Sequence, residues 1–145
     1  KIESLCADLT DTVVFITADH GHIDIQMDFF EENYPDFAKM LERPASIEQR
    51  GISFYVKDEF IPVFKERFLE LFGSDYLIFS KEEVFQNKLF GPGNPHPNLT
   101  GLGDFIAPAI GTKTMFWNKT SPIFKSHHAG LTSQEMKIPL IVVEK

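Results

Sequence analysis

The sequence has very little cysteine, no long apolar run and no excess of positive charge. Cys6 is the only cysteine among 145 residues, which excludes an internal disulfide and a zinc site built from cysteines. A single cysteine is compatible with a reducing compartment, so the cytoplasm is slightly favoured. No apolar run approaches the roughly 18 residues of a membrane-spanning helix, and the polar segment Lys1 to Asp11 does not resemble a signal peptide. We therefore expect no membrane segment in this chain.

The charge balance excludes further classes of partner. The formal net charge is −7, and acidic and basic residues are interspersed. Nucleic-acid polymers and anionic membranes require a basic face, so neither is an expected partner. A small phosphate-bearing substrate stays possible, because metal ions can reverse the local charge of an acidic site. With 43% hydrophobic residues, including 15 Phe, the chain has enough apolar material for one core.

Alternating apolar segments predict an α/β fold class. The first is Thr12 to Thr17, a β-branched and aromatic run that is typical of a buried, parallel strand. Ile138 to Val143 is a second fully apolar strand near the end of the chain. Ligands bind at the carboxyl ends of strands in open α/β sheets, so the polar residues after Thr17 are candidates for a site.

The middle of the chain predicts a small α/β lobe. Its expected strands and helices are a short helix after Pro35, a strand at 51–56, a helix at 58–72, a strand at 76–79, a helix at 80–88 that begins with a capping box, and two strands at 104–110 and 113–117 that pair across a turn. Residues 91–103 and 125–130 are expected loops, and Thr132 to Glu135 is a second capping box.

Asp19 and His20 directly follow the first strand. An oxygen and a nitrogen ligand at a strand end can bind one metal if the backbone turns, and Gly21 permits such a turn. The tripeptide alone is common and fits a hydrogen-bonded turn equally well. His22 extends the cluster as a residue beside a metal or as a plain surface residue.

Two adjacent histidines, His127 and His128, lie near the other end of the chain. Considered alone, they fit an exposed loop better than a metal site. Both histidine-rich segments, however, lie next to apolar strands that could belong to one sheet. The same ambiguity holds for Arg50, which could meet a phosphate but more often forms a structural ion pair.

Two motifs resemble the alkaline phosphatase superfamily, and most closely its branch of type I phosphodiesterases and nucleotide pyrophosphatases. Val14 to Gly21, VFITADHG, is similar to the metal-binding signature. His128 to Met136, HAGLTSQEM, followed by the final apolar strand, resembles the closing motif. Segments between the motifs are also similar to bacterial members of this branch: Arg50 to Val56, Leu89 to Gly91 and Gly103 to Ala107. The resemblance covers nearly the whole chain.

The resemblance implies the C-terminal part of an alkaline-phosphatase-like three-layer sandwich with a small inserted lobe. Residues 1–27 and 111–145 would form the metal-binding core, and residues 28–110 a cap-like insertion. Two divalent ions, typically zinc, are implied: Asp19 and His20 match the ligands of one ion, and His128 matches a ligand of the other. His128 is preferred to His127 because it directly precedes the AGLT turn, in which Ala129 replaces a family glycine.

The resemblance also implies that the family's nucleophilic Thr or Ser lies upstream of this chain, together with the other metal ligands. The full-length protein would hydrolyse a small phosphoester or a nucleotide, whereas this chain alone would be inactive and would bind metal poorly. A sulfatase, a phosphoglycerate-mutase-like enzyme and a non-catalytic interaction module are the alternatives. Strands without neighbours would also favour self-association.

Overall fold

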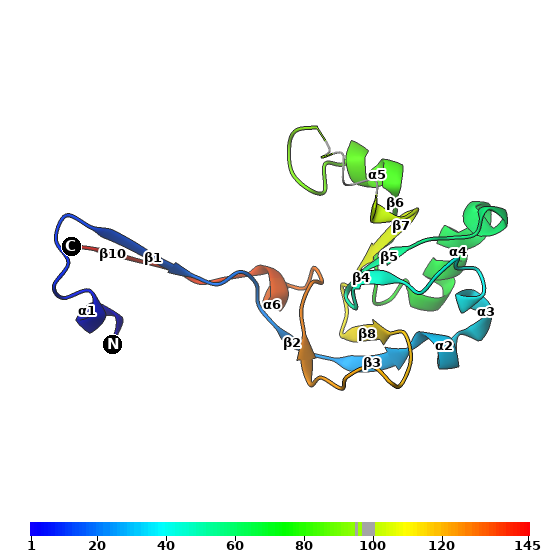
Figure 1. Cartoon of the computed structure of the whole chain (residues 1–145), viewed down its shortest axis with the longest axis horizontal. Coiled ribbons are helices and arrows are strands. Elements are labelled where there is room, and N and C mark those ends of the chain that lie inside the picture. The colour runs from blue at the N-terminus through cyan, green and yellow to red at the C-terminus, as the bar shows by residue number, and fades with distance from the viewer. Residues whose placement is uncertain (95, 97–100) are drawn as a thin grey trace.

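The computed structural model describes residues 1–94, 96 and 101–145. The chain forms a rounded body and a long two-stranded ribbon that projects from it, with both chain termini at the far end of the ribbon (Figure 1). The fold is mixed α/β and contains several small sheets, which confirms the expected fold class. No helix in the described part of the chain is long and apolar enough to cross a membrane.

The ribbon consists of β1 (Val13–Thr17) and β10 (Leu140–Glu144). These are the two apolar strands of the sequence, but the prediction that both are buried is wrong, and so is the prediction that the first is parallel. They run antiparallel, with Val13 opposite Glu144 and Thr17 opposite Leu140. Phe15 is 65% exposed, and Leu140, Ile141 and Val142 are also exposed. An apolar run shows that a strand can be buried, but it determines neither its direction nor what covers it.

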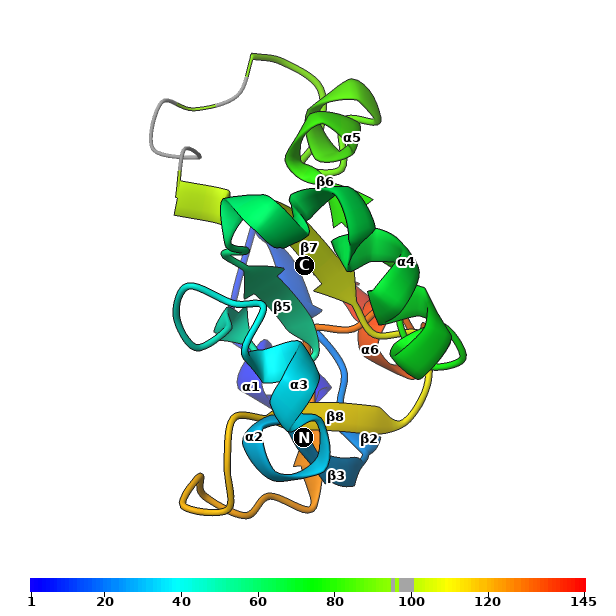
Figure 2. The same ribbon diagram turned by 90° about the vertical axis from the view of Figure 1, so that its right-hand side faces the viewer.

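The body is built around a four-stranded antiparallel sheet in the order β4-β5-β7-β6. Its strands are β4 (Ser46–Glu48), β5 (Gly51–Phe54), β7 (Phe105–Pro108) and β6 (Phe79–Ser80). Helix α4 (Ile61–Phe72) lies across one face of this sheet (Figure 2). The expected helix at 58–72 is therefore confirmed, with its first residues in the short helix η1 (Asp58–Phe60).

Phenylalanine side chains from α4 and the sheet form the core. Phe64 and Phe68 of α4 are fully buried, and the ring of Phe64 stacks on Phe105 with centroids 5.1 Å apart. Phe54 of β5 contacts both α4 rings at 5.4 and 5.5 Å. Burial of each such ring contributes on the order of 2 kcal/mol. The core thus fixes the sheet and helix of the lobe without help from the ribbon.

Two smaller sheets connect the body to the ribbon. β2 (Ile23–Asp24) pairs antiparallel with β9 (Ser126–His127), and β3 (Gln26–Phe29) pairs parallel with β8 (Lys113–Phe116). The prediction that the strands at 104–110 and 113–117 pair with each other is wrong, because β7 joins β5 and β6 instead. The expected loop at 125–130 also contains β9.

The remaining helices are short. Their bounds are α1 (Ile2–Leu5), α2 (Phe30–Asn33), α3 (Pro35–Ala38), α5 (Lys81–Gln86) and α6 (Ser133–Met136). The capping box at Ser80 is confirmed: its hydroxyl accepts the Glu83 N–H at 3.2 Å, and its N–H donates to the Glu83 carboxylate at 2.7 Å. At α6, the hydroxyl of Thr132 donates to Glu135 at 2.6 Å. Five of the residues in the expected loop at 91–103 lie outside the described part.

Candidate metal centre

The rings of His20 and His128 lie face to face where the ribbon joins the body. Their centroids are 3.8 Å apart and their planes differ by 9°. His20 lies between β1 and β2, and His128 directly follows β9. The structure therefore brings together the two histidines that the motifs single out, although they are far apart in the sequence.

His22 is the third member of this cluster. In the β2–β9 pair, Ile23 lies opposite His127. One step along the antiparallel ladder therefore places His22 beside His128, and their ring centroids are 5.1 Å apart. The ligand nitrogens of His20, His22 and His128 all lie within 4.8 Å of one another. We call this set the three-histidine group.

Asp19 lies at the edge of the three-histidine group. Its side chain is 86% exposed, and its Oδ2 is 3.5 Å from Nε2 of His20. Its Oδ1 accepts the backbone N–H of His20 at 3.0 Å. Backbone hydrogen bonds of this kind, together with the charge of His20, lower the pKa of the Asp19 carboxyl. Asp19 is therefore an ionised oxygen donor beside one of the three rings.

A second group shares His128. Glu48, His127 and His128 also have ligand atoms within 4.8 Å of one another. His127 is 9% exposed, and its ring lies edge-on to Phe116 and Phe124, with centroids 6.1 and 5.9 Å away. Its Nδ1 is 3.2 Å from the carbonyl of His128, which leaves Nε2 for another partner. We call this set the glutamate–histidine group.

The surroundings of His128 favour its neutral form. Burial is the largest influence that lowers the pKa of His128, and the nearby charge of His20 adds to it, while Glu48 acts in the opposite direction. A metal ion binds the neutral imidazole, so a lowered pKa keeps this side chain available as a ligand.

Gly21 allows α6 to approach His20 closely. Its N–H donates to the carbonyl of Glu135 at 2.8 Å, and a Cβ at position 21 would lie 1.8 Å from the carbonyl oxygen of Gln134. The sequence suggested that Gly21 is needed for a turn. The structure shows another reason, because the φ angle of Gly21 is not positive and its lack of a side chain makes room for the α6 backbone.

The segment after His128 is held by a buried ion pair. Glu135 accepts from Arg50 at 2.6 and 2.8 Å and from the N–H of Gly130 at 2.8 Å. Arg50 is fully buried, so it forms the structural ion pair that the sequence favoured. Between His128 and Gly130, Ala129 has φ +82°, a left-handed conformation that favours glycine.

A cavity of about 120 Å³ lies beside Glu48. Its lining is mixed: it includes the aromatic residues Phe30, Phe116 and Trp117 together with polar residues such as Ser46 and Gln49. Phe116 also contacts His127, so the cavity and the histidines share one side chain. This places a recess of mixed polarity next to the cluster of metal-binding side chains.

No protein-family model and no curated protein sequence matches the chain. Solved structures do match: human ectonucleotide pyrophosphatase/phosphodiesterase 5, at 11% identity and a TM-score of 0.65 over 97% of this chain, and the murine protein of that name, at 12% identity and 0.64 over 99%. An inactive form of the murine protein in complex with AMP matches at 14% identity and 0.56 over 88%. The chain spans 36%, 37% and 33% of these neighbours, so the likeness shows the fold of one part of such a protein.

The motifs pointed to Asp19, His20 and His128 as ligands and to His22 and His127 as neighbours. In the structure, a ring nitrogen of His22 lies within 4.8 Å of one on His128, which is close enough for both to bind one metal ion. Asp19, by contrast, belongs to neither of the groups found among the described residues. Glu48 was not singled out from the sequence. It lies in a short strand of the lobe, and no spacing signal connects it to residues near position 128.

Proposed function

We propose that this chain is the closing, metal-binding part of a two-metal phosphoester hydrolase of the phosphodiesterase and nucleotide pyrophosphatase type. The observation that carries the proposal is the contact between His20 and His128. Each belongs to a separate motif that resembles the family, and the fold brings the two rings into contact although the motifs are far apart in the sequence. The likeness to solved ectonucleotide pyrophosphatase/phosphodiesterase structures supports the same family.

The donor atoms fit divalent transition ions such as zinc. Two ligands of a tetrahedral zinc ion, each at 2.0–2.2 Å, lie roughly 3.4 Å from one another. Asp19 Oδ2 and His20 Nε2 are 3.5 Å apart. The spacing of this pair therefore suits a shared ion as well as it suits an ion pair, and the lowered pKa values of Asp19 and His128 favour the forms that bind metal.

Asp19 and His20 would hold one ion, and His128 would contribute to the other. Such ions, when bound, neutralise the charge of a phosphoester and lower the pKa of a hydroxyl or water that attacks phosphorus. The chain's own residues orient the ligands: Gly21 and Glu135 join the His20 turn to α6, and Gly130 joins the His128 turn to the same carboxylate. The nucleophilic Thr or Ser of the proposal lies upstream of this chain.

The division into a core and an inserted lobe is part of the proposal. The pairs β1–β10 and β2–β9 join residues 1–27 to residues 111–145. The four-stranded sheet lies entirely within residues 28–110. Of the strand pairs in the described part of the chain, only β3–β8 crosses the boundary, since β3 ends at Phe29. The strand pairing therefore supports a core made from both ends of the chain and a lobe inserted between them.

The proposed substrate is a small phosphoester or a nucleotide. Trp117, which is partly exposed in the lining of the cavity beside Glu48, would contact the flat, apolar part of such a molecule. The phosphate would then lie toward the histidines. The AMP complex of the murine neighbour is compatible with this substrate class.

Hydrolysis assays on the longest natural protein that contains this chain test the proposal. We expect zinc-dependent cleavage of bis(p-nitrophenyl) phosphate, with slower cleavage of p-nitrophenyl phosphate and of the sulfate ester. His20→Ala and His128→Ala should each remove the activity, whereas His96→Ala, outside both groups, should retain it. Unchanged activity in the first two variants would contradict the proposal, and faster cleavage of the sulfate ester would favour a sulfatase.

A further inference from the structure

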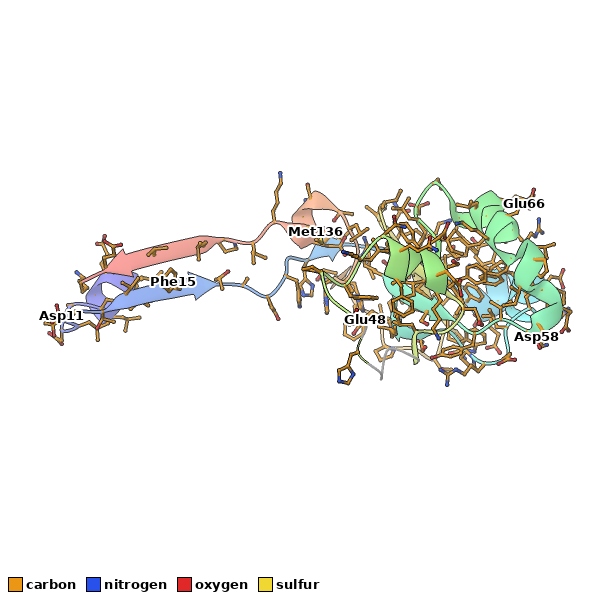
Figure 3. All side chains as sticks on the ribbon, turned by 90° about the horizontal axis from the view of Figure 1, so that it is seen from above. Asp11, Phe15, Glu48, Asp58, Glu66 and Met136 are labelled. Atoms are coloured by element: carbon orange, nitrogen blue, oxygen red, sulfur yellow. The ribbon has the colours of Figure 1, made fainter. Side chains whose placement is uncertain are left out.

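The β4–β5 hairpin of the lobe places Glu48 beside the histidines. This residue lies at the end of β4, opposite Gly51 in the β4–β5 hairpin. A Cβ at Gly51 would contact the carbonyl of Ala129 at 3.1 Å, so the hairpin packs directly against the residue that follows His128. Figure 3 shows Glu48 on the side of the body that faces the ribbon.

The hairpin turn beside Glu48 is rigidly anchored. The carbonyl of Gln49 accepts from the hydroxyl of Tyr76 at 3.1 Å, and Tyr76 is fully buried. Arg50 donates to Thr114, to the carbonyls of Lys113 and Gly111, and to Glu135. Because these hydrogen bonds hold the backbone of the turn in place, the Glu48 carboxylate loses little backbone freedom when it binds an ion.

The residue before Glu48 has an unusual backbone conformation. Ile47 has φ +76° although its side chain is β-branched, and that side chain is 59% exposed. Positive φ costs a β-branched residue about 1–3 kcal/mol, and such strain concentrates at functional sites. No burial of Ile47 compensates for it, so the conformation must be maintained by the anchored hairpin around it.

From these observations we infer that Glu48, His127 and His128 form a cation site of their own, separate from the ion held at Asp19 and His20. The donors are one carboxylate oxygen and two imidazole nitrogens within 4.8 Å of one another. A set of two His and one carboxylate is the ligand set of zinc in several hydrolases and also suits manganese or cobalt. His127 and Glu48 thereby become ligands and not only neighbours of the site.

The inference rests on the proposed function in one respect, since it makes His128 a metal ligand. It changes the expectation that this chain binds metal poorly, which assumed only three ligands. His20 and His22 have ligand nitrogens within 4.8 Å of each other and Asp19 lies 3.5 Å from His20, whereas Glu48 and His127 join His128 in the second group. The lobe residue Glu48 would then connect the proposed insertion to the metal centre.

Zinc titration of the chain by isothermal calorimetry, with metal analysis after dialysis, tests the inference. We expect two zinc ions per chain. Glu48→Gln and His127→Phe should each weaken the binding of the same zinc ion by about tenfold or more. His22→Ala should weaken the binding of the other ion. The Phe replacement keeps a ring between Phe116 and Phe124, and Glu82→Gln, on the exposed face of α5, is the matched control.

One zinc ion per chain, unaffected by either folded variant, would overturn the inference. Circular dichroism without metal identifies a variant that fails to fold, and the other variant then decides. Cobalt spectra provide a second readout, because loss of a ligand changes the absorption of the bound ion. Absence of hydrolysis by the longer protein would count against the proposed function alone, since ion counting does not depend on turnover.

Discussion

Arg50 and Glu135 form a two-pronged ion pair in which both side chains are almost completely buried. Nε of Arg50 is 2.6 Å from Oε1 of Glu135, and Nη2 is 2.8 Å from Oε2. The pair joins the β4–β5 hairpin of the lobe to α6, which lies at the base of the ribbon (Figure 1). It therefore holds together the two parts of the chain that contribute ligands to the proposed metal centre.

Removal of one partner of this pair should be strongly destabilising. Arg50→Met leaves the Glu135 carboxylate buried without its counter-ion, which costs about 3–5 kcal/mol. Urea unfolding followed by circular dichroism measures the change. Arg67→Met is the control, because the Arg67–Glu70 pair is 54% exposed at both side chains and contributes about 0–1 kcal/mol. Equal losses in the two variants would show that the buried pair does not stabilise the fold.

Stability should fall in acid through Glu135. Burial alone would raise the pKa of Glu135, but hydrogen bonds from Arg50, Thr132 and Gly130 outweigh it and lower the pKa from 4.5 to about 2. Because the pKa is lower in the folded state, the contribution is present above pH 4.5 and is lost as the pH falls toward 2. The shift corresponds to about 3 kcal/mol.

Urea midpoints of the wild type and Glu135→Gln, measured from pH 6 to pH 2, check this prediction. The difference in unfolding free energy between them should be constant above pH 4.5 and should shrink below it. A difference that is independent of pH would show that Glu135 does not titrate in this window.

Gly21 should not tolerate a side chain. In Gly21→Ala, the new Cβ would overlap the carbonyl oxygen of Gln134, so α6 must move away from the His20 turn. We expect a loss of about 2 kcal/mol or more in unfolding free energy and weaker zinc binding. Gly101→Ala is the control, because a Cβ added at Gly101 would have no other heavy atom within 4 Å. Identical behaviour of both variants would contradict the close approach of α6.

The exposed ribbon should cause self-association. Phe15 and Val142 lie directly opposite each other in the β1–β10 pair and are 65% and 46% exposed. Figure 3 shows Phe15 on the ribbon, away from the body. Phe15→Lys combined with Val142→Glu replaces this apolar pair with opposite charges, which maintains strand pairing and reduces apolar surface. Sedimentation velocity should show a concentration-dependent oligomer for the wild type and a smaller one for the variant.

Val63→Lys is the matched control for that experiment, because Val63 is 49% exposed on α4, away from the ribbon. It should leave the association unchanged. A monomeric wild type at high concentration would contradict the prediction.

Local features of the sequence predicted local features of the structure. The capping boxes at Ser80 and Thr132 and the phenylalanine spacing of α4 all depend on residues within one or two helical turns. Strand partners were harder to predict, because pairing depends on segments far apart in the chain. Thus β7 and β8 were expected to pair with each other, whereas each has other partners.

By itself the sequence determined which segments are apolar, where two helices begin, and that the candidate ligands are histidines and a carboxylate at 19–22 and 127–128. Only the tertiary structure decided that β1 and β10 run antiparallel, that Gly21 makes room for α6, and that Glu48 reaches the histidines. The reason is physical: propensity and capping act between near neighbours, whereas a ligand cluster requires backbone segments from distant parts of the chain to be fixed by one core.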